Sequence, residues 1–119
     1  MKHKKEDGLM FCVLSCFRKR EKLKLKSIID LWNFFDHSTP TVDDINCCLN
    51  RLENDDFISV DEDNRIYFLP KFKTFEKKNK KFREGHIEKQ VRYQHIFEQL
   101  EYNYKEKDGK IYFKDYKNE

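Results

Sequence analysis

The sequence predicts a mostly helical α+β domain, and three observations support this prediction. Apolar residues recur at helical spacing in two neighbouring stretches, over residues 28–35 and 42–52. Two short runs rich in β-branched and aromatic residues, "FISV" and "RIYFL", flank the polar tetrapeptide "DEDN", which is the pattern of a β-hairpin. The 119 residues include only three Gly and two Pro, so the chain has the length of one domain and few loop-forming residues.

The amino-terminal part is expected to form a basic tail followed by a buried helix. Residues 1–7 carry several lysines and predict a frayed end. The run "LMFCVLSCF", residues 9–17, is apolar on nearly all sides and predicts a helix that is surrounded by other elements. Basic residues 18–20 suit the negative pole of that helix. The alternating "KLKLK", residues 22–26, predicts an edge strand whose lysines prevent aggregation.

Two amphipathic helices are expected next. Ser27 with Asp30 resembles a capping box, so the first helix is predicted to begin there. Pro40 disfavours helix at Thr39 and ends it, and Thr41 is a good N-cap for the second helix. Trp32, Leu49 and Leu52 are expected to hold the scaffold within the two apolar stripes, which are Ile28, Leu31, Trp32 and Phe35, then Val42, Ile45, Cys48, Leu49 and Leu52.

The carboxyl-terminal part, residues 71–119, is predicted to be a basic helical extension with a terminal hairpin. Pro70 ends the second strand of the first hairpin. The segment 71–83 is expected to form a helix pinned to the core by Phe72, Phe75 and Phe82, and a longer helix should follow Gly85. Asp108-Gly109 between aromatic runs is a strong hairpin signal. The apolar positions expected to support the longer helix are Ile87, Val91, Ile96, Phe97 and Leu100.

Several of these elements also share their order and sequence with a known family. The stretches "SIIDLWNFF", "DHSTPT", "VDDINCCLNRLEND" and "FISVDEDNRIYFL" resemble the helices, turn and wing of a winged helix-turn-helix domain. The resemblance covers about residues 9–70 and implies a winged-helix core within a single domain, 1–119. The chain departs from the family where Asp56 replaces the glycine that usually follows the second helix, and where that helix lacks the usual basic residues. Such a scaffold serves DNA binding in some proteins and protein binding in others.

The charge distribution weighs against DNA at this helix. Residues 1–26 carry a formal charge of +6, residues 27–70 a charge of −8, and residues 71–119 a charge of +5, which together give the net +3. Contacts between basic groups and phosphates dominate DNA affinity, whereas the predicted helix-turn-helix and wing form the acidic part of the chain. Only Arg51 and Arg65 are basic there.

The first functional hypothesis is therefore a binding protein that offers an acidic face to a basic protein partner. Complementary charge speeds encounter and selects the partner, and an inhibitor or immunity protein of a nucleic-acid-cleaving toxin is one case that fits. The simpler alternative is that helix-start and turn chemistry alone placed the acids there. The residues assigned to this face are Asp43, Asp44, Glu53, Asp55, Asp56, Asp61, Glu62 and Asp63.

The second hypothesis is a winged-helix DNA-binding regulator that contacts nucleic acid through its basic segments, 17–26 and 71–83. Lysine and arginine side chains would follow the backbone while aromatic rings stack on exposed bases. The simpler alternative is a solvated charged surface with the aromatic rings turned inward. The cationic residues assigned to this role are Arg18, Lys19, Arg20, Lys77, Lys78, Lys80, Lys81 and Arg83.

No pattern in the sequence predicts an enzyme, a cofactor or a metal site. His3, His37, His86 and His95 are scattered, and no short catalytic or phosphate-cradling motif is present. The cysteines, spaced C-x-x-x-C and C-C, match no zinc or redox signature and are expected to be small apolar side chains. No apolar run approaches the length of about 18 residues that suggests a membrane helix. A cytoplasmic location is therefore expected.

Overall fold

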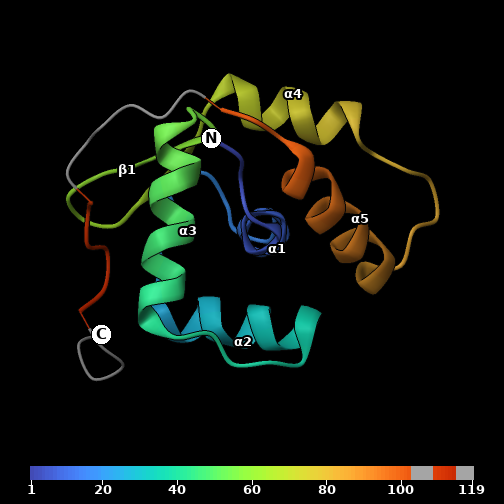
Figure 1. Ribbon diagram of the computed structural model, residues 1–119. Helices are drawn as coiled ribbons and strands as arrows, with labels where there is room; N and C mark the ends of the chain where they lie inside the picture. The colour runs from blue at the N-terminus through green and yellow to red at the C-terminus, as the bar shows by residue number, and fades with distance from the viewer. Residues whose placement is uncertain (103–108, 115–119) are drawn as a thin grey trace.

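The computed structural model of the chain describes residues 1–102 and 109–114. Over these residues it forms a helical α+β fold with five helices and one two-stranded antiparallel sheet. Figure 1 shows α1 end-on in the middle of the molecule, with the other helices arranged around it. The elements in chain order are α1 (Lys5–Leu14), α2 (Leu25–Asp36), α3 (Val42–Asn54), β1 (Ile58–Val60), β2 (Ile66–Phe68), α4 (Pro70–Lys78) and α5 (His86–Gln99).

Helix α1 is central because its sequence is apolar nearly all round. Its eight residues from Asp7 to Leu14 are all buried, so every side of it packs against a neighbour. The closest neighbour is α5, and Gly8 makes the approach possible. A Cβ atom added at Gly8 would lie 2.4 Å from the carbonyl oxygen of Tyr93, so only glycine lets the two backbones meet here.

An aromatic cluster joins α4 and α5 to the first half of the chain. The ring of Phe11 in α1 stacks on Phe72 of α4 with centroids 4.0 Å apart, and on Tyr93 of α5 with centroids 5.2 Å apart. Such rings bury a large apolar area and hold specific geometries. The helices after residue 70 therefore pack on the same core as the helices before it. Further rings in contact within this cluster are Phe57, Phe75 and Phe97.

The two predicted amphipathic helices are present, although one starts earlier than expected. The predicted N-cap of α3 at Thr41 is confirmed, and it is part of a capping box: the Thr41 hydroxyl accepts from the Asp44 backbone N–H, and the Asp44 carboxylate accepts from the Thr41 N–H. The box expected at Ser27 is wrong, because α2 already begins at Leu25. Leu25 is buried, and the helix starts where that side chain enters the core.

The predicted hairpin is confirmed. Strands β1 and β2 pair antiparallel, with Ile58 opposite Phe68 and Val60 opposite Ile66. The edge strand expected at residues 22–26 is reduced to one isolated bridge between Lys22 and Arg65, because α2 begins three residues later. Burial of the leucines and exposure of the lysines in "KLKLK" nevertheless follow the alternation in the sequence.

The amino terminus differs most from expectation. Residues 1–7 are not a frayed tail, because α1 begins at Lys5 and both His3 and Asp7 are buried, at 2% and 0% exposure. The helix also ends at Leu14 instead of residue 17. Pro70 not only follows the second strand but occupies the first turn of α4, where its missing N–H costs nothing.

The carboxyl-terminal helices exist, but their buried faces differ from the prediction. Phe72 is buried, whereas Phe82 is 90% exposed and does not reach the core. On α5, Phe97 is buried as predicted, whereas Ile87 and Val91 are 48% and 58% exposed, and the other buried side chains are Gln90 and Tyr93. The face of α5 that packs on the core is the one that brings Tyr93 and Phe97 into contact with Phe11. The predicted terminal hairpin depends on residues 103–108, which lie outside the described part of the chain.

None of the helices in residues 1–102 and 109–114 has the length and apolar character that a membrane span requires.

Candidate binding surfaces

The acids expected to form one face lie at separate places on the structure. Asp43 and Asp44 are exposed in the first turn of α3, and Asp56 is exposed just beyond its carboxyl end. A helix of 13 residues is about 20 Å long at 1.5 Å per residue, so these acids sit at opposite ends of it. Glu62 and Asp63 are exposed in the turn of the hairpin. The acidic residues thus do not form one continuous cluster around α3.

Two of the expected acids are used inside the hairpin region. The Glu53 carboxylate accepts a hydrogen bond from the backbone N–H of Val60 at 2.8 Å and is also bonded to the Tyr112 hydroxyl. Asp61 shapes the hairpin turn by accepting from the backbone N–H groups of Asp63 and Arg65 at 3.0 and 2.9 Å. These bonds agree with the simpler alternative, in which turn chemistry accounts for acidic residues at these positions.

Asp55 belongs to a polar cluster that we call the His3 network, in which His3, Asp7 and Asp55 are buried, Arg51 is partly buried and Lys71 is exposed. One ring nitrogen of His3 lies 2.8 Å from Asp7 and the other lies 2.8 Å from Asp55. Lys71 donates to Asp55 at 2.6 Å, and Arg51 donates to Asp7 at 2.8 Å.

The His3 network ties four parts of the chain together and leaves Asp55 only 9% exposed. Burial alone raises the pKa of the Asp7 carboxyl, but hydrogen bonds from His3 and Arg51 and the Arg51 charge outweigh it, so the pKa lies below its ordinary value. Sequence reasoning missed this cluster because its histidine lies in a segment that looked like a basic tail. The carboxylates of Asp7 and Asp55 therefore serve the fold and are not offered to a partner.

The outer face of α3 is covered by the chain itself. Residues 109–114, which we call the C-terminal strap, run along α3 and reach the hairpin turn. The Asn50 side chain donates to the Lys110 carbonyl at 2.6 Å and accepts from the Lys110 N–H at 3.0 Å. Asn46 donates to the Phe113 carbonyl at 2.8 Å and accepts from the N–H groups of Tyr112 and Phe113.

The hairpin contributes a third contact to the C-terminal strap. Asn64 donates to the Tyr112 carbonyl at 2.9 Å, while the Tyr112 and Phe113 side chains are buried at 6% and 7% exposure. Three asparagine side chains thus bind the backbone of the strap. A helix that reads DNA must place its outer side chains against base edges, and here those side chains, Asn46 and Asn50, are already occupied.

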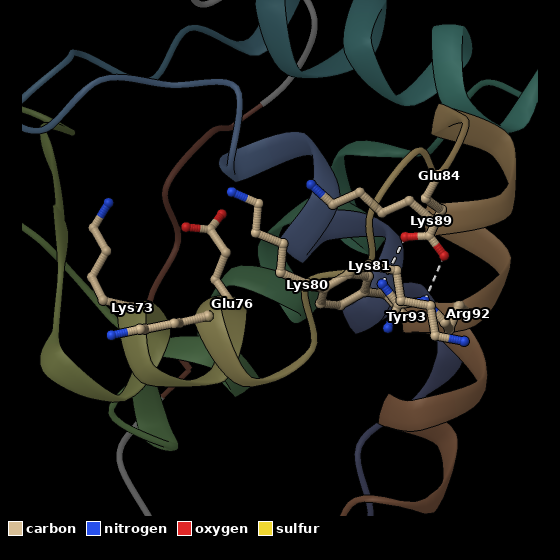
Figure 2. A pocket seen from close by; sticks show the side chains of 9 residues that line it. Lys73, Glu76, Lys80, Lys81, Glu84, Lys89, Arg92 and Tyr93 are labelled. Carbon is tan, nitrogen blue, oxygen red and sulfur yellow. Dashed lines mark hydrogen bonds and ion pairs between the residues drawn. The ribbon is translucent and has the colours of Figure 1, made fainter.

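A different surface gathers basic side chains. A concavity of about 470 Å³ lies between α4, the connection that follows it, and α5. Figure 2 shows Lys73 and Glu76 on α4, Lys80 and Lys81 on the connection, and Arg92 on α5 around this hollow. Six lysine or arginine residues line it against two glutamates, a formal charge of +4. The complete lining is Lys73, Glu76, Lys77, Lys80, Lys81, Glu84, Lys89, Arg92 and Tyr93.

One ion pair organises the concavity and leaves most of its lysines available. Arg92 donates from two nitrogens to the two oxygens of Glu84, at 2.6 and 2.7 Å (Figure 2), a bidentate geometry that fixes both side chains. The Arg92 guanidinium holds the pKa of the Glu84 carboxyl below its ordinary value, and the charges of Lys81 and Lys89 add to the effect. Lys77, Lys80 and Lys81 form no ion pair with any carboxylate in the described residues.

The structure separates the two basic segments that the sequence suggested. The backbone N–H of Arg20 donates to the Ile66 carbonyl, and Arg65 donates to the Arg20 carbonyl, so residues 18–20 lie beside the hairpin. Lys77, Lys80 and Lys81 line the α4–α5 concavity, whereas Lys78 and Arg83 are exposed outside its lining. Sequence reasoning missed Lys89 and Arg92, although their spacing of three residues places them on one face of a helix.

The cysteines provide no candidate reactive centre. All four are free. Cys12 and Cys48 are buried as expected for apolar core positions, whereas the expectation is wrong for Cys16, which is exposed. Burial raises the pKa of the Cys12 thiol to about 12, which keeps it protonated and unreactive at neutral pH. Among residues 1–102 and 109–114, no three side chains of His, Cys, Asp or Glu converge as metal ligands.

Comparison of the chain with protein-family models, with curated proteins and with solved structures finds no match.

Proposed function

We propose that this chain is a non-enzymatic binding protein, built on a winged-helix scaffold, that holds the phosphate backbone of a nucleic acid in the α4–α5 concavity. The observation that carries the proposal is the convergence of six cationic side chains on one hollow with only two carboxylates. One of these carboxylates, Glu84, is already neutralised by Arg92. The remaining lysines repel one another, and bound phosphates relieve that repulsion.

Three features support the winged-helix scaffold. Three helices precede a hairpin in the chain order of that fold. The bridge between Lys22 and Arg65 adds a third, very short segment to the hairpin. Asp56 adopts a φ of 60°, which is the left-handed conformation that explains why the family usually has glycine there, and aspartate is one of the few other residues that tolerates it.

The proposal moves nucleic-acid contact from α3 to α4 and α5. The C-terminal strap occupies the outer face of α3, and the acids at both ends of that helix disfavour phosphates. In contrast, the concavity presents lysines from two helices and the connection between them. Phosphate contacts of this type carry no sequence information, so the protein should bind without strong sequence preference.

The basic-partner hypothesis remains a second proposal, supported by the acids that stay exposed, which are Asp43, Asp44, Asp56, Glu62 and Asp63. An inhibitor or immunity protein of a basic toxin is the form it would take. It ranks second because these acids lie at both ends of α3 and in the hairpin turn. Charge reversal distinguishes the two proposals, because each predicts that a different pair of substitutions abolishes binding.

The test measures binding of a fluorescein-labelled 20-nucleotide oligonucleotide by fluorescence anisotropy over a series of KCl concentrations. The wild-type chain should bind, and its affinity should fall steeply with salt. The double variant Lys77→Glu/Lys81→Glu should abolish binding or lower the salt slope by about two, one for each lost phosphate contact. A matched control, Lys5→Glu/Lys114→Glu, makes the same charge change at exposed positions outside the concavity and outside segments 17–26 and 71–83.

Retention of oligonucleotide binding in the control and loss in Lys77→Glu/Lys81→Glu would support the proposal. Equal loss in both double variants would show that only net charge matters and would refute a built site. Failure of the wild-type chain to bind at low salt would reject the nucleic-acid proposal outright. In that case Asp43→Lys/Asp44→Lys should be compared with the wild type for loss of a co-purifying basic protein.

A further inference from the structure

Phe82 is an exposed aromatic residue beside the α4–α5 concavity. It is 90% exposed, although the sequence pattern predicts that it anchors a helix to the core. It follows Lys81 and precedes Glu84 by two residues, and both of these neighbours line the α4–α5 concavity. A phenylalanine left in water loses the burial that normally favours it, so the ring is available to a ligand that is bound in the adjacent concavity.

We propose that the ligand is a single-stranded nucleic acid and that Phe82 stacks on one of its bases while the concavity holds the adjacent phosphates. This inference deepens the proposed function and rests on it. Proteins that bind single strands combine a positively charged groove with aromatic side chains on which bases stack. Here the groove and the exposed ring are next to one another in the chain.

The local chemistry suits a base better than an apolar protein partner. Lys80 and Lys81 precede Phe82, and the guanidinium of Arg83 lies 6.0 Å from the centre of its ring. An apolar partner that covered Phe82 would have to bury these charges as well, which is costly without counter-charges. A nucleotide supplies both a flat apolar face for the ring and a phosphate for the cations.

The same chemistry favours a single strand over a duplex. A base inside a duplex has both faces covered by its neighbours, so an aromatic side chain reaches one only after unstacking it. Tyr93, the other ring at the concavity, is 1% exposed and packs on Phe11, so it cannot offer a second platform. Helix α3, the element that would enter a duplex groove, is covered by the C-terminal strap.

The test compares Phe82→Ala with wild type on two ligands, a fluorescein-labelled mixed-sequence 15-nucleotide single strand and the corresponding 15-base-pair duplex. Wild type should bind the single strand more tightly than the duplex. Phe82→Ala should weaken single-strand binding by about 5- to 150-fold, the range for loss of one stacked base, and change duplex binding little. Phe82→Tyr, which keeps a stacking ring, should retain wild-type affinity.

Phe34→Ala is the matched control, because Phe34 is also an exposed ring, at 52%, but lies on α2, stacks on His86 and is not among the residues that line the concavity. It should bind the single strand as wild type does. Equal affinity of wild type for both ligands, or an equal effect of Phe82→Ala on both, would overturn the single-strand assignment and leave phosphate binding in place. Absence of binding to either ligand would instead reject the proposed function itself.

Discussion

Replacing Asp7 by asparagine removes the central anion of the His3 network while keeping the size of the side chain. The Asp7 side chain is 0% exposed and accepts hydrogen bonds from His3 at 2.8 Å, from Arg51 at 2.8 and 3.0 Å, and from the Lys4 backbone at 3.1 Å. Asparagine offers one acceptor oxygen and one NH₂ group. At least one donor of His3 or Arg51 then faces another donor.

The expected loss of unfolding free energy follows from the burial of the ion pair between Asp7 and Arg51. Breaking a buried ion pair by removing one partner costs about 3–5 kcal/mol. The Arg51 side chain is 18% exposed and keeps some hydration, so Asp7→Asn should lower the free energy of unfolding by about 3 kcal/mol, the lower end of that range. Domains of this size have about 5–15 kcal/mol in total, so the variant should still fold and give a measurable transition.

The pH dependence gives a second and independent signature. The pKa of Asp7 in the folded chain lies below its ordinary value of 3.8, so the stabilisation is fully present above that value and is lost as pH falls through the folded pKa. Each unit of difference corresponds to about 1.4 kcal/mol. Wild type should therefore lose stability on acidification below about pH 4, and Asp7→Asn should lose less over the same interval.

The assay is urea unfolding followed by circular dichroism at pH values from 7 down to 3. Glu6→Gln is the control, since it makes the same chemical change one residue away on a partly exposed side chain. A cost for Asp7→Asn no larger than that for Glu6→Gln would refute the reasoning. So would an acid-induced loss of stability that is identical in Asp7→Asn and wild type.

Two further outcomes follow from close contacts in the fold. Gly8→Ala should lower the free energy of unfolding by about 3 kcal/mol, the upper part of the range for overpacking, because its Cβ would meet the Tyr93 carbonyl at 2.4 Å. Thermal unfolding measures this loss. A variant with the melting temperature of the wild type would contradict the close packing of α1 on α5. Asn50→Ala should release the C-terminal strap locally, because the backbone amide of Lys110 donates to Asn50 at 3.0 Å. Hydrogen exchange at the Lys110 amide should therefore be faster in the variant. Unchanged exchange would show that the strap does not depend on this side chain.

Local chemistry explains the parts of the fold that the sequence predicted. The N-cap at Thr41 and the apolar stripe of α3 depend on residues within a few positions of one another, and both are confirmed. The hairpin of β1 and β2 is likewise encoded in two short runs and the turn between them. The start of α2 at Leu25 was missed because long-range burial of that side chain, and not a side-chain cap, sets it. The start of α1 at Lys5 was missed because Asp7, whose carboxylate accepts from the Lys4 backbone N–H, lies in a stretch that looked like a basic tail.

The face of α5 that packs on the core could not be predicted without the tertiary structure. On α5 the sequence offers one apolar face with Ile87 and Val91 and another with Tyr93 and Phe97. The ring of Phe11 decides between them, because it packs on Tyr93 and Phe97 at centroid distances of 5.2 and 5.6 Å. Periodicity alone cannot choose between two faces whose partners lie elsewhere in the chain.

The sequence by itself thus determined that the chain is helical with a small hairpin, that α3 is capped by Thr41, and that acidic and basic residues are segregated along it. Only the tertiary structure decided which of these charges are available. It joins His3 to Asp55 across 52 positions and Asn46 to Phe113 across 67, and such contacts depend on how whole elements pack. Packing buried one set of acids, covered the face of α3, and brought the lysines of α4 and its connection beside Lys89 and Arg92 of α5.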